Sequence, residues 1–453
     1  MYDVIVIGGG PGGYAAAIRV RQLGAQAALV EAAELGGTCV NRGCIPSKVW
    51  LRAAYLKHWI ERAGEFGLKA ALGGFNPTAL VERKNAVAQG IREGMTALLQ
   101  KNGVTLIRGR GVLKSAREVV VEGKTYEAKK IIIATGSSPV VPEVPGLKEA
   151  ALTSDELFNA GDLPASVLVY GSGPIEVEMA SLLAAFGTKV TLAAPQSRIL
   201  PREDHDVSQR LGQALREQGV EIITGATLAQ VEKAGPGFIA RLGEKTMTVA
   251  RVALAARKPN TDGLGLPDLG LKLNDEGAIP VNARLETAVP GVLALGDATG
   301  GWMLSHAASA MGVTAAENAM GRQADFPARL IPRGLWTNPE AAAVGLTEEE
   351  AEKQGHEVIV GDFPYPVNGL AMLRGQVDGA VKIISEAKYG EILGVHIVGA
   401  GATEIIGEAV LALQLECTAD TLAHTIRMHP TFSECMMDAA RDAAAWALYL
   451  PPK

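Results

Sequence analysis

The sequence predicts an α/β chain with two Rossmann-like nucleotide-binding domains, followed by a C-terminal α+β domain. A strand, a glycine-rich turn, a helix and a second strand occur around Gly8 and again around Gly171, 163 positions later. A turn of this kind lets a pyrophosphate approach the backbone at a helix N-terminus. From about Pro332 onward, strands alternate with a helix and no such turn occurs, so we expect a packing or dimer-forming domain there.

Length and composition narrow the possible functions. The chain has 453 residues, enough for two to four domains. Its formal net charge of −6 provides no basic surplus for a phosphate backbone, so we expect no nucleic-acid partner. No apolar run reaches the roughly 18 residues of a membrane span. Because "MYDVIVIGGG" leads directly into a strand, no leader is expected and the predicted location is cytoplasmic.

The first Rossmann-like unit begins with "DVIVIGGGPGGYAAAIRVRQLGAQAALVEA". Gly8, Gly10 and Gly13 fit the spacing G-x-G-x-x-G, in which the glycines make the turn, admit the pyrophosphate and let the helix pack on the strand. Glu31 ends the next strand, 18 residues after Gly13, where a carboxylate can hold ribose hydroxyls. Further along, "VPGVLALGDATGG" delivers Asp297 at the carboxyl end of a buried strand, a usual place for ligand contacts.

Two cysteines lie close together in "GGTCVNRGCIPSK", residues 36–48. Cys39 and Cys44 could form a redox pair, half of a metal site or two buried thiols. Zinc would require further ligands at matched spacing, and Cys417 and Cys435 are distant and 18 residues apart, so no metal site is predicted. Thiols at the start of a helix lie near backbone donors, which favours thiolate formation and exchange. The redox interpretation is therefore preferred.

A histidine and a carboxylate lie close together near the end of the chain, in "HPTFSE". Pro430 keeps His429 out of a regular helix, so its ring can be presented while Glu434 holds one of its nitrogens. That arrangement suits a general base that takes a proton from a dithiol. A lone histidine would more often be structural, but the cysteine pair favours catalysis.

Taken in order along almost the whole chain, these motifs resemble the FAD-containing pyridine nucleotide-disulfide oxidoreductases and, within that family, the dihydrolipoamide dehydrogenases. The resemblance implies a FAD-binding domain over 1–143 with the redox disulfide, an NAD(P)-binding-like domain over 144–265, a return to the FAD-binding domain over 266–331 and a dimerisation domain over 332–453. The FAD contacts it implies are Gly8, Gly10, Pro11, Gly13, Glu31, Gly37, Thr38, Lys48, Gly111, Ala134, Thr135, Gly136, Asp297, Met303, Leu304 and His306.

The resemblance also implies the catalytic roles. Cys39 would be the interchange thiol and Cys44 the thiol beside the flavin, while Lys48, paired with Glu178, would stand near the flavin N5. Lys48 could otherwise be a solvated helix lysine. His429 and Glu434 would act across a homodimer interface on the disulfide of the other subunit. The implied substrate is lipoamide or a lipoylated carrier protein, with NAD as the electron acceptor.

The second unit departs from the family pattern where NAD should bind. Gly171, Gly173 and Ala256 mark the expected contacts, but Glu176 replaces the third glycine and the second strand ends on Ala194 without a ribose carboxylate. Ala256 itself stands where the family usually has glycine. A carboxylate beside a pyrophosphate is disfavoured by repulsion and desolvation, unless Glu176 points to solvent. We therefore expect weak NAD use.

Two further departures concern neighbouring positions. Pro174 takes a position often held by a larger residue that gates the nicotinamide pocket. Arg427 stands where the family often has histidine, and it could alter the substrate channel by placing a fixed cation near its mouth; the sequence leaves its role open.

Other functions are less consistent with the sequence. The C-terminal end lacks the cysteine pair of a mercuric reductase, and Pro195 and Gln196 stand where glutathione reductase would have cations for NADPH. A soluble transhydrogenase would not need both Cys39 and Cys44. The remaining alternative is a flavoprotein oxidoreductase or complex subunit that passes electrons to a partner other than NAD(P). Cys417 and Cys435 are interpreted as buried small residues, although a regulatory thiol at Cys435 is possible.

Overall fold

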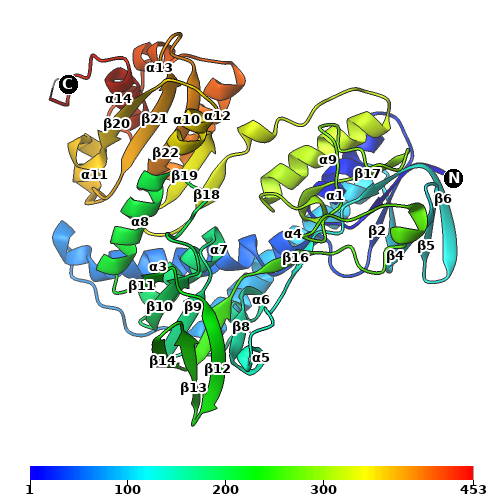
Figure 1. Ribbon diagram of the computed structural model, residues 1–453, viewed down its shortest axis with the longest axis horizontal. Helices are drawn as coiled ribbons and strands as arrows, with labels where there is room; N and C mark the ends of the chain where they lie inside the picture. Colours follow the sequence, from blue (N-terminus) through cyan, green and yellow to red (C-terminus); the bar gives the residue numbers. More distant parts are fainter. Residues whose placement is uncertain (452–453) are drawn as a thin grey trace.

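The computed structural model describes residues 1–451, and three large sheets organise that part of the chain (Figure 1). Two of the sheets contain parallel strands flanked by helices, and the third is antiparallel. The predicted class is confirmed: α/β, with two Rossmann-like units and a C-terminal α+β unit. The four segment boundaries stay a prediction, and the last two residues of the segment 332–453 lie outside the described residues.

The first sheet has seven strands in the order β3-β2-β1-β6-β5-β4, with β17 also paired to β6. Its central strands are parallel and buried on both faces, which explains their uninterrupted apolar sequences. The strands are β1 (Tyr2–Ile7), β2 (Ala27–Glu31), β3 (Thr105–Arg108), β4 (Gly111–Ser115), β5 (Glu118–Val121), β6 (Lys124–Ile133) and β17 (Val292–Ala294). The chain therefore returns to this sheet after building the second one.

Helices α1 (Pro11–Gln22) and α9 (Ser305–Ala319) pack tightly against each other beside the first sheet. Their closest approach needs glycine, since a Cβ added to Gly312 would lie 2.3 Å from the carbonyl oxygen of Gly12. The N-terminal ends of α1 and α9 consequently open into the same cleft.

The second sheet is parallel, with the strand order β11-β10-β9-β15-β8. Its strands are β8 (Ala151–Thr153), β9 (Ser166–Tyr170), β10 (Lys189–Ala194), β11 (Glu221–Thr224) and β15 (Arg251–Leu254). Helices α7 (Pro174–Ala185) and α8 (His205–Glu217) belong to this unit. An antiparallel sheet extends from it, formed by β12 (Leu228–Ala234), β13 (Gly237–Leu242) and β14 (Lys245–Val249).

A short two-stranded ribbon joins the first two units, formed by β7 (Ser137–Pro139) and β16 (Arg257–Pro259). The third sheet has the order β18-β19-β22-β21-β20. Its strands are β18 (Arg333–Leu335), β19 (Ala341–Gly345), β20 (Val358–Pro364), β21 (Ala380–Glu386) and β22 (Ile392–Val398). The remaining helices of this unit are α10 (Glu348–Lys353), α11 (Gly369–Arg374), α12 (Ala402–Gln414), α13 (Ala419–His424) and α14 (Ser433–Ala443).

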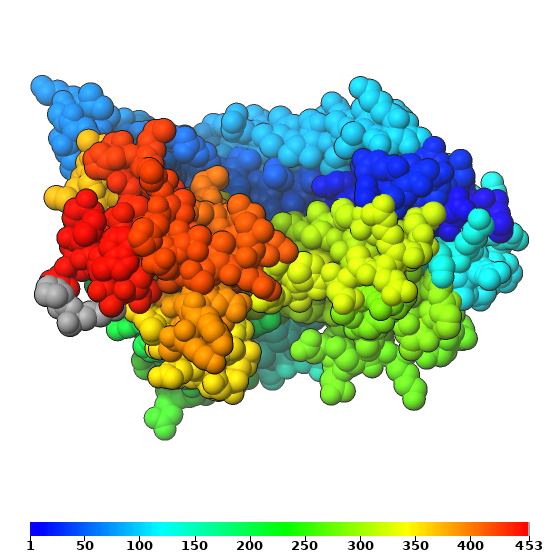
Figure 2. Space-filling model, turned by 90° about the horizontal axis from the view of Figure 1, so that it is seen from above, coloured from blue at the N-terminus to red at the C-terminus, as the bar shows by residue number. Residues whose placement is uncertain are grey.

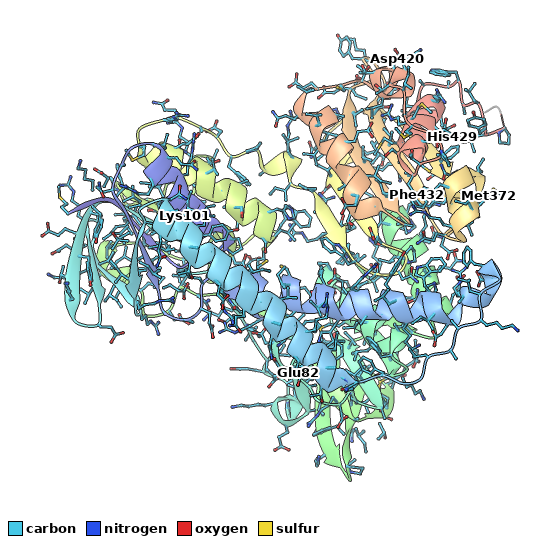
Figure 3. The ribbon with its side chains drawn as sticks, turned by 180° about the vertical axis from the view of Figure 1, so that it is seen from behind. Glu82, Lys101, Met372, Asp420, His429 and Phe432 are labelled. Atoms are coloured by element: carbon cyan, nitrogen blue, oxygen red, sulfur yellow. The ribbon has the colours of Figure 1, made fainter. Side chains whose placement is uncertain are left out.

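Two long helices, α3 (Cys44–Glu61) and α4 (Pro77–Lys101), run from the first unit across the second (Figures 1 and 3). Figure 2 shows the C-terminal unit, coloured orange to red, at one end of the molecule and the amino-terminal strand, in dark blue, at the other. Helix α3 therefore carries its first residues at the junction of the first two units, where the main cleft lies.

Candidate active site

The main cleft of the protein has a volume of about 970 Å³ and lies between the first and second units. That volume is at the upper end of the range for small-molecule and cofactor sites. Most of the residues expected to bind FAD line it: Gly8, Gly10, Pro11, Glu31, Gly37, Thr38, Lys48, Gly111, Ala134, Thr135, Gly136, Asp297, Met303, Leu304 and His306. Cys39, Cys44 and Glu178 line the same cleft.

One end of the cleft is shaped by the first glycine turn. Gly8 has a φ of +108°, and a Cβ added to Gly13 would lie 1.8 Å from the carbonyl oxygen of Gly8, so the turn and the start of α1 touch. Gly13 acts through this packing and does not line the cleft. A Cβ added to Gly10, in contrast, would find its nearest neighbour 3.9 Å away, at Gly37. The space in front of Gly10 is open to a phosphate.

Glu31 lies beside the same turn, at the carboxyl end of β2. Its carboxylate accepts hydrogen bonds from the backbone N–H groups of Gly9, at 2.6 Å, and Ala33, at 2.7 Å. The carboxylate is thus held at the edge of the phosphate site, where the fold places the contact to a ribose.

The two cysteines lie on consecutive helices. Cys39 belongs to α2 (Gly37–Asn41), and Cys44 is the first residue of α3. Both are free thiols in the structure. The interaction with Cys39 lowers the pKa of the Cys44 thiol, and Ser305 and the Lys48 ammonium act in the same direction. The same interaction and burial raise the pKa of Cys39. Cys44 is therefore the thiol that ionises first.

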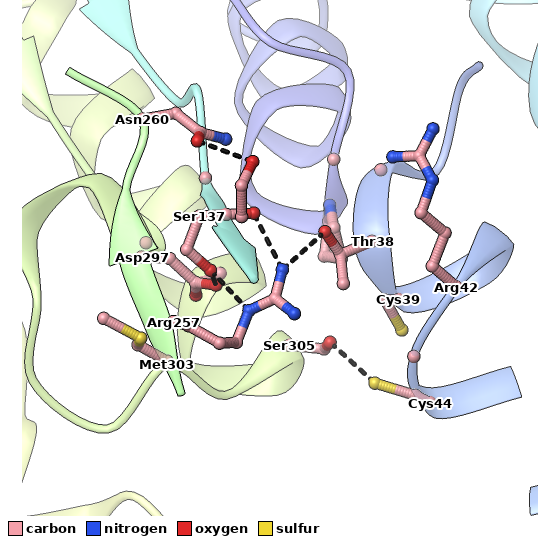
Figure 4. Close-up of a pocket in the computed structure, with 18 of the residues that line it drawn as sticks. Thr38, Cys39, Arg42, Cys44, Ser137, Arg257, Asn260, Asp297, Met303 and Ser305 are labelled. Carbon is pink, nitrogen blue, oxygen red and sulfur yellow. Dashed lines mark hydrogen bonds between the residues drawn. The ribbon is translucent and has the colours of Figure 1, made fainter. Parts of the chain in front are cut away.

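Ser305 was not predicted from the sequence. As the first residue of α9, it places its Oγ 3.2 Å from the sulfur of Cys44 (Figure 4). Only the tertiary structure brings them together, because the two residues are 261 positions apart. No local pattern around Ser305 distinguishes it from other serines at helix starts.

Lys48 lies one turn after Cys44 and faces the second unit. Its Nζ lies 3.0 and 2.9 Å from the two carboxylate oxygens of Glu178 on α7. The ammonium also lies 4.1 Å from the ring centroid of Trp336, whose backbone N–H donates to Glu178 at 2.9 Å. The alternative of a freely solvated lysine is wrong. Trp336 is a further cleft residue that sequence reasoning missed.

A second network also escaped prediction, and it joins the two units above the cysteines (Figure 4). The Arg257 guanidinium donates to the Ser137 hydroxyl at 2.8 Å and to the Thr38 hydroxyl at 3.3 Å. Ser137 in turn donates to Asp297 at 2.6 Å. Arg257 thereby connects β16 with the segment that carries Cys39.

The predicted histidine–carboxylate pair is formed, but it lies outside the main cleft. His429 Nδ1 and Glu434 Oε1 are 2.9 Å apart, and the backbone N–H of Thr431 holds the other carboxylate oxygen at 2.7 Å. The His429 side chain is 77 % exposed on the C-terminal unit (Figure 3). One subunit thus presents a half-buried carboxylate behind an exposed imidazole, outside the cleft that holds its own cysteines.

The structure decides two points that the sequence left open. Glu176 does not point to solvent, since it is only 9 % exposed. The Arg427 side chain is 5 % exposed and paired with Glu408. Gly171, Gly173 and Ala256 do not line the main cleft.

Within residues 1–451 there is no cluster of three or more His, Cys, Asp or Glu able to hold a metal ion. Helices in that part of the chain are all too short or too polar to cross a membrane.

Paired thiols at a helix start, facing a nucleotide-sized cleft beside a Lys–Glu pair, define a dithiol–disulfide oxidoreductase. Residues 2–312 match the family described as pyridine nucleotide-disulphide oxidoreductase, and residues 331–440 match the dimerisation domain of the same family. The chain belongs to the pyridine nucleotide-disulphide oxidoreductases and is an enzyme of that class.

Similar proteins cover the chain from end to end. The dihydrolipoyl dehydrogenase of Thermus scotoductus is 40% identical over 457 aligned residues, spanning 99% of each chain, and one from Bacillus subtilis is 36% identical, spanning 98% of this chain and 99% of its own. Among solved structures, LpdA of Mycobacterium tuberculosis has a TM-score of 0.89 at 29% identity, covering 97% and 99% of the two chains. The HOCl-induced flavoprotein disulfide reductase RclA of Escherichia coli has a TM-score of 0.86 at 28% identity, covering 96% and 99%.

The residues of the first unit fit FAD, the cofactor expected from the sequence. The open cradle at Gly10, the carboxylate of Glu31 and the long cleft that ends at Cys44 and Lys48 provide for a pyrophosphate, a ribose and a flavin, respectively. Bound FAD would supply two-electron chemistry beside the thiols, while the protein supplies orientation and electrostatics. The family assignment supports the same cofactor.

Proposed function

We propose that this protein is a FAD-dependent dihydrolipoamide dehydrogenase, which oxidises the dithiol of a lipoyl group through a Cys39–Cys44 disulfide. The observation that carries the proposal is the contact of the two thiols at the end of a cleft that fits FAD, with the Cys44 pKa lowered by Cys39. The curated relatives named dihydrolipoyl dehydrogenase, at 35–40% identity over the full length, support the choice of substrate.

Each thiol has a different task in this proposal. A substrate thiolate attacks Cys39, the S–S bond to Cys44 breaks, and Cys44 leaves as a thiolate. The second substrate thiol then displaces Cys39, so the substrate becomes a cyclic disulfide while the enzyme gains two electrons. A low pKa makes Cys44 the better leaving group, and a high pKa lets Cys39 leave with a proton. Lys48, held by Glu178, contributes positive charge beside the Cys44 thiolate.

His429 is the proposed base for the substrate thiols. Its ring is oriented by Glu434 and open to solvent, which suits proton exchange with an incoming thiol. Because it lies outside the cleft of its own subunit, we assign it to the disulfide of the other subunit in a homodimer. The matched dimerisation domain supports this assembly.

The physiological substrate is proposed to be a lipoylated carrier protein, with free lipoamide as a simpler equivalent. A carrier would bring its lipoyl group on a long flexible arm, so only the dithiol has to enter the site. A cytoplasmic location and the individual roles of the FAD contacts stay predictions.

The test is an anaerobic titration of the FAD-loaded, oxidised protein with dihydrolipoamide. Two protein thiols should appear for each substrate oxidised, and the flavin absorbance should change in the same titration. Cys39→Ser and Cys44→Ser should each abolish the thiol gain. Cys417→Ser is the matched control and should behave as the wild type. Failure of the wild type to gain thiols would overturn the proposal.

A further inference from the structure

The phosphate site of the second Rossmann-like unit is occupied by a side chain of the protein itself. Glu176 lies in the first turn of α7, and its carboxylate folds back over the glycine turn that precedes the helix. A Cβ added to Gly171 would lie 2.8 Å from Oε1 of Glu176, and a Cβ added to Gly173 would lie 2.8 Å from Oε2. The carboxylate therefore rests directly on both glycines of the fingerprint.

Backbone donors hold the carboxylate in that position. The backbone N–H groups of Glu176 itself, Ala255 and Gly173 interact favourably with the charged carboxylate. Those of Gly173 and Glu176 are free donors at the N-terminus of α7, the groups that bind a phosphate in an open unit of this fold. Ala255 follows β15, so the carboxylate also ties the turn to the neighbouring strand. Burial nevertheless raises the pKa of Glu176.

Glu176 could also have a purely structural role as a cap of helix α7. A glutamate at the third position of a helix can accept from the N–H of the residue before the helix, which stabilises the helix end. That arrangement accounts for the contact with Gly173 but not for the burial, nor for the donor from Ala255. A helix-capping Glu176 would occupy the same N–H groups that a phosphate would need. The carboxylate and a phosphate therefore exclude each other even if Glu176 also stabilises the helix end.

The two Rossmann-like units place their carboxylates differently around the glycine turn. In the first unit, the equivalent residue is Gly13, and the cradle in front of Gly10 is open. There the carboxylate comes from Glu31 at the end of β2, beside the phosphate site. In the second unit, β10 ends at the buried Ala194, which has no group for a ribose. The second unit thus has a carboxylate in the phosphate site and none at the ribose contact.

A neighbouring polar side chain, Gln196, is already hydrogen-bonded within the protein. Gln196, two residues after β10, accepts a hydrogen bond of 2.5 Å from the hydroxyl of Ser172 in the glycine turn. A dinucleotide would therefore have to displace the carboxylate of Glu176 from Gly171 and Gly173 and bind without a ribose carboxylate. The residues of the second unit do not fit NAD or NADP.

We propose that Glu176 closes the second Rossmann-like unit to dinucleotides and is the residue that sets the low affinity of this enzyme for NAD(P). The inference goes beyond the dithiol reaction, and it does not depend on which dithiol the enzyme oxidises. It predicts that removing one side chain frees the N–H groups at the start of α7 for a phosphate, although the ribose carboxylate stays absent.

The experiment measures binding of NADH and NADPH to the FAD-loaded protein by calorimetry and by nucleotide fluorescence, without turnover. The variants are Glu176→Ala and Glu176→Gly, because the fingerprint accepts either residue at this position. Glu217→Ala, at the exposed end of α8 in the same unit, is the matched control for loss of one negative charge. FAD content and thermal unfolding establish that each variant is folded.

We expect the wild type and Glu217→Ala to bind NADH weakly, and both Glu176 variants to bind at least about tenfold more tightly, because the donors released from the carboxylate become available to a phosphate. Adding Ala194→Glu to Glu176→Ala should tighten NADH binding again by restoring the ribose contact. The inference is overturned if the wild type binds NADH as tightly as Glu176→Ala does. Titration of the same samples with dihydrolipoamide reports separately on the proposed function.

Discussion

Lys48 on α3 and Glu178 on α7 form an ion pair across the junction of the first two units, with Nζ 2.9 and 3.0 Å from the two carboxylate oxygens. The pair is partly buried, and the side chains are 29% and 11% exposed. Glu178 orients the Lys48 ammonium near Cys44 and also accepts a hydrogen bond from the backbone N–H of Trp336. Because Lys48, Glu178 and Trp336 belong to the first, second and third units, this contact links all three units beside the thiols.

Glu178→Gln should slow thiol exchange with dihydrolipoamide, because Lys48 loses the charge that holds it beside Cys44. The free energy of unfolding should fall by roughly 1–3 kcal/mol, as for a partly buried ion pair that loses one partner. Stopped-flow reduction and denaturant unfolding measure the two effects. Glu317→Gln, which breaks the Arg19–Glu317 pair between α1 and α9, should change stability without slowing exchange.

Ser305→Ala should raise the pKa of Cys44, because the hydroxyl 3.2 Å from its sulfur favours the thiolate. The Cys44 pKa lies below its ordinary value, so the thiolate persists at neutral pH and is lost as the pH falls through that pKa. The midpoint for this loss should move to higher pH in the variant. Thiolate ultraviolet absorbance of the reduced protein provides the measurement. Ser47→Ala, whose hydroxyl donates to the carbonyl oxygen of Cys44, should leave the midpoint in place.

His429→Ala should greatly slow reduction of the oxidised enzyme by dihydrolipoamide while FAD content stays normal, because His429 lies outside the cleft. Mixing this variant with Cys44→Ser should restore part of the activity, since one site of each mixed dimer combines an intact cysteine pair with an intact histidine. Subunits that stay inactive after verified exchange would show that His429 does not act across the dimer.

Cys435→Ser should leave activity and oxidant sensitivity unchanged. Burial raises the pKa of Cys435 to about 12, so its thiol is protonated at physiological pH and shielded from reagents. Mass spectrometry after alkylation of the folded protein should find Cys435 unmodified. Modification there before unfolding would support a regulatory thiol after all.

Much of the site was predictable because its parts are local in sequence. The glycine turn before α1, the cysteines around the start of α3 and the His429–Glu434 pair each occupy a short segment whose backbone geometry demands particular residue types. The α/β class followed from the two repeated strand–turn–helix segments. Three site residues could not be predicted, namely Ser305, Trp336 and Arg257. Each contacts a partner more than a hundred positions away, and no local sequence pattern marks it.

The sequence by itself determined the fold class, the dithiol chemistry and the presence of an unusual residue at position 176. Whether Glu176 faced solvent or the phosphate site was decided only by tertiary structure. Its carboxylate is buried because the backbone N–H groups of Gly173 and Ala255 converge on one point, and they belong to segments about 80 residues apart that only the folded parallel sheet brings together. Burying a carboxylate is costly unless N–H donors surround it, and the position of such donors is fixed only when the backbone has folded.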